Sequence, residues 1–146
     1  MHFTLSRRGF IASSAALSAA PMMARAKVAE APVAAPQNPL VRQRADAQIF
    51  RHDDGHYYMT GSVPEYDRLV LRRSKTIAGL TSATEAVLWR HEKTGPLSGF
   101  IWAPELHRID GQWIIYFAAG PSGGGEDVFR IRTYAVVCDG PDPMPG

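Results

Sequence analysis

The sequence predicts an all-β fold built from consecutive antiparallel strands, of the kind that form the blades of a β-propeller. From residue 47 onward, apolar or aromatic runs of about four to eight residues alternate with turn signals. The 146 residues include 13 glycines and 11 prolines, which exceeds average usage and suits many short strands and turns. No segment shows the 3.6-residue apolar period of an amphipathic helix.

The first group of predicted strands begins with a hairpin. Residues 47–52 and 56–61 are rich in apolar and aromatic side chains, and Asp53-Asp54-Gly55 between them is typical of a tight turn. Residues 69–73 combine apolar and charged side chains, which predicts a strand with one wet face and with Arg72 and Arg73 at its solvated end. Residues 86–91 are the fourth candidate strand.

The second group repeats this order. Residues 100–109 and 112–119 flank an Asp110-Gly111 turn, and residues 128–138 follow a glycine-rich loop. The pair Asp110-Gly111 lies 56 positions after Asp54-Gly55, and each copy is a strand, an Asp-Gly turn and an aromatic strand. Asp-Gly hairpins are common among β proteins in general, so the echo could be coincidental. Repeats of about 40–50 residues with four strands, however, are typical of propeller blades.

We therefore place a first blade at about residues 46–91 and a second, incomplete blade at about residues 100–146. Two incomplete blades cannot close a propeller, which needs at least about four. We expect the chain to be the N-terminal part of a longer protein.

Residues 1–26 are predicted to be a twin-arginine signal peptide. Arg7 and Arg8 precede a short, mildly apolar Ala/Ser/Leu stretch and a small-residue site at Ala24-Arg25-Ala26. This predicts a bacterial protein that the twin-arginine export machinery delivers to the periplasm or the medium, with no membrane attachment after cleavage. Residues 27–38 lack periodicity and are predicted to be a flexible linker.

Charge and cysteine content exclude two classes of function. Three of the 16 basic residues lie in the leader, which leaves 13 against 14 acidic residues, so a nucleic-acid partner is not expected. Cys138 is the single cysteine, so it can form neither an internal disulfide nor a cysteine-based metal site, and we expect a small buried strand residue. The histidines lack metal-ligand spacing, and no cofactor is expected.

Two carboxylates stand near the start of predicted inner strands, Asp46 in the first blade and Glu105 in the second. In a propeller such positions face a shared central cavity. There, two carboxylates could act as a base and an electrostatic tuner, or could bind sugar hydroxyls. The alternative is that both are ordinary turn residues or solvated charges.

At these residues the sequence resembles the start of a glycoside hydrolase family 43 domain, over about residues 40–146. The resemblance implies an enzyme with a five-bladed propeller that cleaves arabinofuranosides, xylosides and related plant polysaccharide linkages with inversion, and it is strongest to the α-L-arabinofuranosidase branch. The motifs that carry it are Arg44-Ala45-Asp46, Asp54-Gly55-His56-Tyr57-Tyr58, Ser62-Val63-Pro64-Glu65-Tyr66-Asp67-Arg68, Ile101-Trp102-Ala103-Pro104-Glu105 and Asp110-Gly111-Gln112-Trp113-Ile114-Ile115-Tyr116.

The resemblance implies that Asp46 is the general base. In an inverting glycosidase this carboxylate deprotonates a water on the face opposite the leaving group, about 6.5–9.5 Å from the general acid. Ala47 stands where the family usually has proline. The general acid and the pKa-modulating aspartate belong to later blades, so the 146-residue chain alone is expected to be inactive.

The resemblance also implies that Trp102 and Glu105 bind substrate, and the position of His107 beside Glu105 makes it a further candidate for substrate binding. Trp102 would offer its apolar face to a sugar ring, or would instead pack between blades. Glu105 and His107 are two residues apart and so share a strand face. Some family members hold an axial calcium ion, but no ligand set for it can be read here.

Two alternatives remain. The domain could bind carbohydrate through Trp102 and the tyrosines without catalysis. It could also be a small complete β domain with a structural role.

Overall fold

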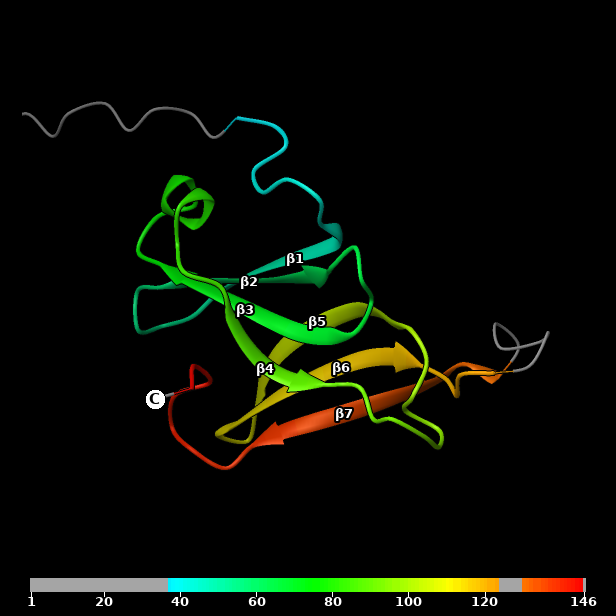
Figure 1. The fold of residues 1–146 in the computed structure, drawn as a ribbon. Coiled ribbons are helices and arrows are strands. Elements are labelled where there is room, and N and C mark those ends of the chain that lie inside the picture. The colour runs from blue at the N-terminus through cyan, green and yellow to red at the C-terminus, as the bar shows by residue number, and fades with distance from the viewer. Residues whose placement is uncertain (1–36, 124–129, 146) are drawn as a thin grey trace, which may run out of the picture. The chain divides into compact units, whose positions relative to one another are not determined.

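The computed structural model of the chain describes residues 37–123 and 130–145. The chain divides into two units at residues 32 and 33, and all described residues belong to the second unit. The predicted signal peptide and residues 27–36 of the predicted linker lie outside the described residues. Figure 1 shows the described unit, in which strands of two sheets are packed together.

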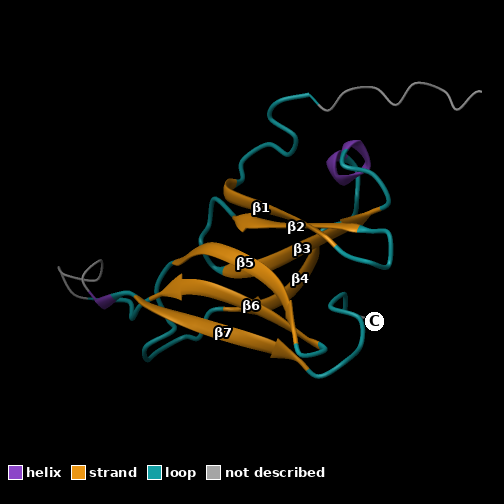
Figure 2. Ribbon diagram, turned by 180° about the vertical axis from the view of Figure 1, so that it is seen from behind, coloured by secondary structure: helices purple, strands orange, loops and turns teal. Residues whose placement is uncertain are grey.

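The first sheet contains four antiparallel strands that follow each other in space as in sequence. A short 3₁₀ turn, η1 (Ala78–Thr81), lies between the third and fourth strands. Strands dominate the described residues, and helix is confined to short turns (Figure 2). The strands are β1 (Ala45–Arg51), β2 (Tyr57–Ser62), β3 (Arg68–Ser74) and β4 (Ala86–Arg90).

The second sheet is a three-stranded antiparallel meander, β5 (Ile101–Ile109), β6 (Gln112–Ala119) and β7 (Arg132–Cys138). Strand β7 begins later than residue 128, where the sequence predicted it. Arg132 pairs with Ala119, the last residue of β6, and the described residues Arg130 and Ile131 lie outside the strand. Residues 128 and 129 themselves are outside the described part. The prediction of an all-β fold is confirmed, and the two sheets succeed each other as blades of a propeller do.

Both inner hairpins turn at the predicted Asp-Gly pairs. In the first, the Asp54 carboxylate accepts a hydrogen bond from the His56 amide at 2.8 Å, and Gly55 has φ +82°. In the second, Asp110 has φ +48° and Gly111 has φ +80°, the left-handed pair that a type I′ turn requires. The turn residues thus fix where each inner strand ends.

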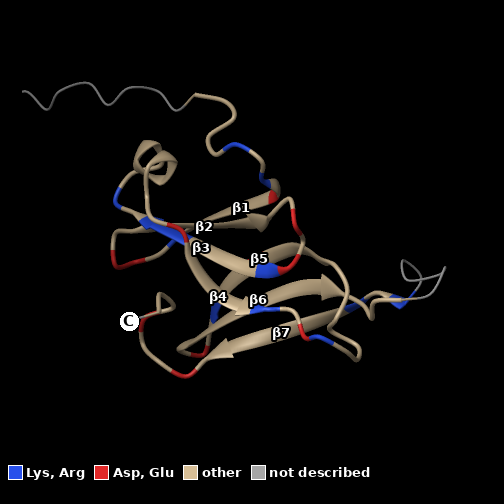
Figure 3. Ribbon diagram, viewed as in Figure 1, with Lys and Arg blue, Asp and Glu red and all other residues tan. Residues whose placement is uncertain are grey.

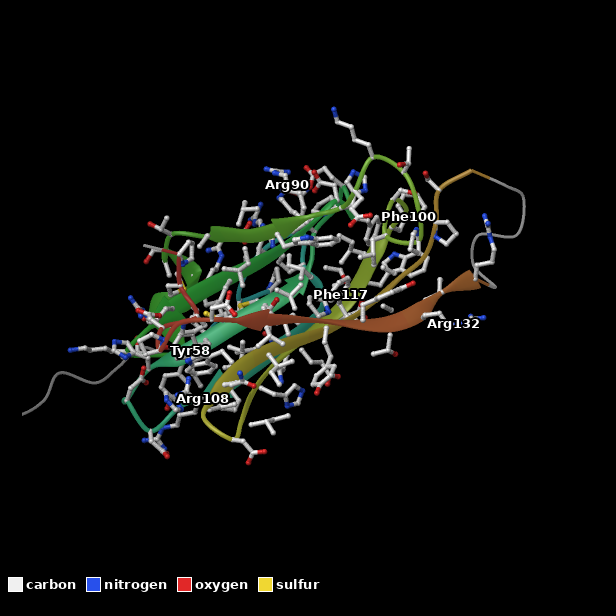
Figure 4. The ribbon with its side chains drawn as sticks, turned by 90° about the horizontal axis from the view of Figure 1, so that it is seen from below. Tyr58, Arg90, Phe100, Arg108, Phe117 and Arg132 are labelled. Carbon is white, nitrogen blue, oxygen red and sulfur yellow. The ribbon has the colours of Figure 1, made fainter. Side chains whose placement is uncertain are left out.

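The core lies between the two sheets. Trp113 from β6 packs against Tyr58 of β2 and against His52, the residue after β1, with ring centroids 5.2 and 4.6 Å apart. Figure 4 shows Tyr58 and Arg108 near one end of the strands, Phe100 near the other end, and Phe117 between them. The buried core consists of Tyr58, Leu69, Leu71, Ile101, Leu106, Trp113, Ile115, Phe117 and Ala119.

Burial and a hydrogen bond to Asp54 raise the pKa of Tyr58 to about 12, so its hydroxyl stays a donor, with the Asp54 oxygen 2.8 Å away. Tyr116 is 36% exposed, unlike Tyr58, because it lies on the opposite face of its sheet from Trp113 and Phe117.

The prediction of a solvated strand end was wrong for Arg72, whose side chain is 16% exposed, whereas the Arg73 side chain is 34% exposed. The segment after β3 folds back over the strand end, so that the Arg72 guanidinium donates to the carbonyls of Leu80, Thr81 and Ala83. Arg73 donates to Asp142 at 2.6 Å. Figure 3 shows basic and acidic residues interspersed along the strands and loops of the described chain.

Candidate functional site

Asp46 stands at a bulge near the start of β1. The register with β2 shifts between Ala45 and Gln48, and Asp46 inside this bulge has the left-handed φ of +50°. Its side chain is exposed at the surface, and one carboxylate oxygen, Oδ2, accepts a hydrogen bond from the Ser62 hydroxyl at 3.0 Å. The carboxylate predicted to be the base is therefore exposed to solvent, and one of its two oxygens is bound by Ser62.

Ser62 connects this carboxylate to the second sheet. It is the last residue of β2 and only 3% exposed. Its Oγ also accepts a hydrogen bond from the backbone amide of Ala103 in β5, at 3.0 Å. One buried hydroxyl thus bridges the inner strands of both sheets.

Strand β5 contains a matching bulge. Its register with β6 shifts between Trp102 and Glu105, and Ala103 inside the bulge has φ +44°. Trp102 pairs with Ala118 and Glu105 pairs with Tyr116, two positions of β6 that share a face. The extra residue therefore places Trp102 on the same face as Glu105, where simple strand alternation would have put it on the opposite face.

Trp102 borders a cavity of about 400 Å³ that is also lined by Glu65, His91 and Phe100. It packs at an angle against Tyr66 and Phe100, with ring centroids 6.3 and 5.7 Å apart. Phe100 is 58% exposed. Both functions expected of Trp102, packing and offering an apolar surface, are compatible with this position.

Glu105 and His107 form a pair on the exposed face of the second sheet. His107 Nε2 lies 3.2 Å from Glu105 Oε2, and their side chains are 38% and 61% exposed. The His107 ring packs edge-on against Tyr116, with centroids 5.6 Å apart. Of the predicted site residues, Glu105 thus contacts His107 directly. Asp46 is linked through the Ser62 hydroxyl to Ala103, the residue after Trp102.

Two polar side chains that the sequence did not single out hold the start of β1. The Gln48 amide accepts from the Leu106 amide at 2.6 Å and donates to the Leu106 carbonyl at 3.2 Å. Glu85 binds Arg44 with both oxygens, the shortest contact being 2.6 Å, and binds Arg72 at 3.1 Å. Asp46 is two residues from Arg44 and two from Gln48, so both contacts restrain its backbone.

Burial disfavours the charged form of Glu85, but hydrogen bonds from Arg44 and Arg72 outweigh that effect and lower the pKa of its carboxyl. The side chains of Arg44, Arg72 and Glu85 are 13%, 16% and 18% exposed. Glu85 is therefore ionised at neutral pH and fixes both arginines.

Over residues 37–123 and 130–145, no three His, Cys, Asp or Glu side chains are grouped so as to hold a metal ion. Within the same ranges, no helix has the length and apolar character needed to span a bilayer. Cys138 is a free, half-buried thiol near the Gly140 amide, rather than a fully buried residue.

The fold and this site define an all-β domain of successive antiparallel blades with a carboxylate near the opening of its first inner strand. The chain belongs to Glycosyl hydrolases family 43, whose sequence profile matches residues 36–145. The family expected from the sequence motifs is thereby confirmed.

Individual relatives agree with this assignment. The chain is 53% identical over 135 residues to an extracellular exo-α-(1→5)-L-arabinofuranosidase of Streptomyces chartreusis, covering 92% of this chain and 39% of the relative. It is 53% identical over 107 residues to α-L-arabinofuranosidase 43 of Humicola insolens, covering 73% of this chain and 21% of the relative.

A solved structure shares the fold. The crystal structure of α-L-arabinofuranosidase from Lactobacillus brevis superposes with a TM-score of 0.70 at 48% identity, covering 74% of this chain and 34% of that one. The chain thus spans about two fifths or less of the length of these relatives.

Proposed function

We propose that the natural protein carrying this chain hydrolyses α-L-arabinofuranosidic bonds of plant-type polysaccharides or oligosaccharides with inversion, and that Asp46 is its general base. The observation that carries the proposal is the exposed Asp46 carboxylate, presented at the inner-strand bulge and held by Ser62. The names of the relatives support an arabinofuranoside as the substrate class.

In this mechanism the free side of the Asp46 carboxylate accepts a proton from a water molecule as the water attacks the anomeric carbon. The hydrogen bond from Ser62 engages one oxygen, Oδ2, and leaves the other available for the water. A general acid elsewhere in the natural protein protonates the departing oxygen. Trp102, Glu105 and His107 contribute to sugar binding, the tryptophan through its apolar face and the Glu105–His107 pair through hydrogen bonds.

The organisation of the natural protein is part of the same proposal. Residues 46–91 and about 100–146 are the first two blades of a five-bladed propeller. Residues 1–26 direct twin-arginine export and residues 27–38 form a linker. Secretion is supported by relatives that are named extracellular.

The test compares the natural protein with its Asp46→Asn variant on an aryl α-L-arabinofuranoside, with an aryl β-xyloside as the competing substrate. Loss of the base is expected to lower kcat about 10²- to 10⁴-fold, with the arabinoside as the preferred substrate. The matched control is Asp53→Asn, which removes an exposed carboxylate in the hairpin turn. NMR of the first product anomer reports stereochemistry. An unchanged kcat in Asp46→Asn, or a product of retained configuration, would contradict the mechanism.

A further inference from the structure

We infer that Ser62 is a positioning residue, whose hydroxyl fixes the Asp46 carboxylate and couples it to the strand that carries Trp102. This inference rests on the proposed role of Asp46 as the base. Beyond that role, Ser62 is the group that orients the base, and the Ala103 amide of the second sheet is the group that fixes Ser62.

The Ser62 hydroxyl is placed between Asp46 and Ala103. Ser62 Oγ donates its one proton to Asp46 Oδ2 at 3.0 Å and accepts the Ala103 amide proton at 3.0 Å. A hydroxyl has a single donor, so acceptance from Ala103 directs that donor toward the carboxylate. Burial of Ser62 to 3% exposure limits water as a competing partner.

The backbone is left-handed at both residues that Ser62 contacts. Asp46 at φ +50° and Ala103 at φ +44° both occupy the left-handed region, which aspartate tolerates better than most residues and which is costly for alanine. Such residues persist where surrounding contacts over-determine them, and they concentrate at functional sites. Here both left-handed residues hydrogen-bond to one side chain, Ser62. The Ser62 hydroxyl therefore contacts both bulges and helps to hold them in this conformation.

The backbone of β2 lies close to the bulge of β1 at Gly61. A Cβ on Gly61, the neighbour of Ser62, would lie 3.1 Å from the Ala45 carbonyl oxygen and 3.4 Å from the Ala47 Cα. The absence of a side chain at Gly61 lets β2 approach the bulge closely enough for the Ser62 hydroxyl to reach Asp46.

The experiment uses Ser62→Ala and Ser62→Thr in the natural protein, with Thr60→Ala as the matched control. Thr60 is also a buried β2 hydroxyl, but it donates to the Val70 carbonyl at 2.8 Å, within its own sheet. Ser62→Ala is expected to lower kcat about 10- to 100-fold per folded molecule, the range for a hydrogen bond to a charged group, with KM within about twofold. Ser62→Thr keeps the hydroxyl and restores most of kcat, and Thr60→Ala leaves kcat within about twofold.

A second measurement does not depend on activity. Hydrogen exchange of the peptide that contains Ala103 should become about tenfold faster in Ser62→Ala and not in Thr60→Ala, because only Ser62 accepts that amide proton. Thermal unfolding of all variants separates a folding defect from a change in kcat.

The outcomes separate the two proposals. Unchanged kcat in Ser62→Ala, with an inactive Asp46→Asn, overturns the role of Ser62 and leaves the proposed function intact. Unchanged Ala103 exchange in Ser62→Ala overturns the coupling to β5. Full activity of Asp46→Asn overturns both proposals. A kcat loss in Thr60→Ala as large as that in Ser62→Ala also overturns the inference, because any buried β2 hydroxyl would then suffice.

Discussion

The two inner hairpins, β1–β2 and β5–β6, share a backbone feature, a bulge that contains a left-handed residue, but they place different side chains in it. Each inner strand has a register shift of its pairing and a left-handed residue inside the bulge. In β1 that residue is Asp46, whose carboxylate points outward, and in β5 it is Ala103, which offers only its amide. The comparison shows that the two copies share backbone geometry, and that only the first copy carries an ionisable side chain at this position, the residue we propose as the base.

The two strand starts are also held differently. The start of β1 depends on side chains, through the contacts of Glu85 with Arg44 and Arg72. The start of β5 is held by backbone hydrogen bonds, from the Ile101 amide to the Tyr66 carbonyl at 2.9 Å and from the Gly99 amide to the Gly120 carbonyl at 2.8 Å. Only the first arrangement depends directly on charge, and therefore on pH.

Glu85→Gln should reduce stability the most, because it removes the ion pairs of Glu85 with Arg44 and Arg72 that hold the start of β1. Two partly buried guanidinium groups then lose their anionic partner, and we expect the free energy of unfolding of the full chain to fall by about 2 kcal/mol. Urea unfolding at pH 7 measures this loss. The control is Glu65→Gln, because the Glu65 side chain is 58% exposed in its pair with Arg68 and should cost about 0.5 kcal/mol or less.

Acid should remove the same contribution. The pKa of Glu85 is lowered by folding, so its stabilisation is fully present above the ordinary value of 4.5 and is lost as pH falls through the lower folded value. The difference between wild type and Glu85→Gln should therefore be constant near neutrality and shrink below about pH 4.5. A difference that grows in acid would show that the sign of the Glu85 effect is wrong.

The next effect comes from Gln48→Ala, which breaks the direct link between the two inner strands. The variant leaves the amide and carbonyl of Leu106 without their side-chain partner, and Leu106 is 1% exposed. We expect a loss of about 1–2 kcal/mol and faster exchange of the Leu106 amide. Gln112→Ala, on an exposed position of β6, is the control. Equal losses in the two variants would argue against the link.

The smallest effect should have the opposite sign. Ala103→Gly removes the Cβ from a residue at φ +44°, and we expect stabilisation by about 0.5–1 kcal/mol. Ala118→Gly, in the regular strand opposite Trp102, should destabilise by a similar amount. Thermal unfolding of both variants measures this contrast, and a loss of stability in both would mean that Ala103 is not strained.

The hairpins were predictable because their signals are local. Asp54-Gly55 and Asp110-Gly111 specify turns through their own dihedral preferences, and the aromatic runs beside them specify strands. The start of β7 was not predictable, because it depends on the register in which β7 pairs with β6, where Arg132 lies opposite Ala119.

The candidate site was only partly predictable for a related reason. Asp46 and Trp102 stand in short motifs, but Ser62 was considered only as the first residue of a longer motif. Its importance depends on pairing with Ala45 across the bulge and on the approach of Ala103 from 41 residues away. The burial of Arg72 could not be predicted, because its partners lie on the segment between β3 and β4, which folds back over the end of β3.

The shared Ser62 hydroxyl has a consequence for protein engineering. A designer who varies the β5 segment around Trp102 to accept another sugar would also move the Ala103 amide, and with it the hydroxyl that contacts Asp46. Under the roles proposed above for Asp46 and Trp102, libraries at this segment are expected to trade selectivity against turnover unless Ala103 and Ser62 are kept together. Gains in selectivity should accumulate more freely at Glu105 and His107, which project from the exposed face of the second sheet.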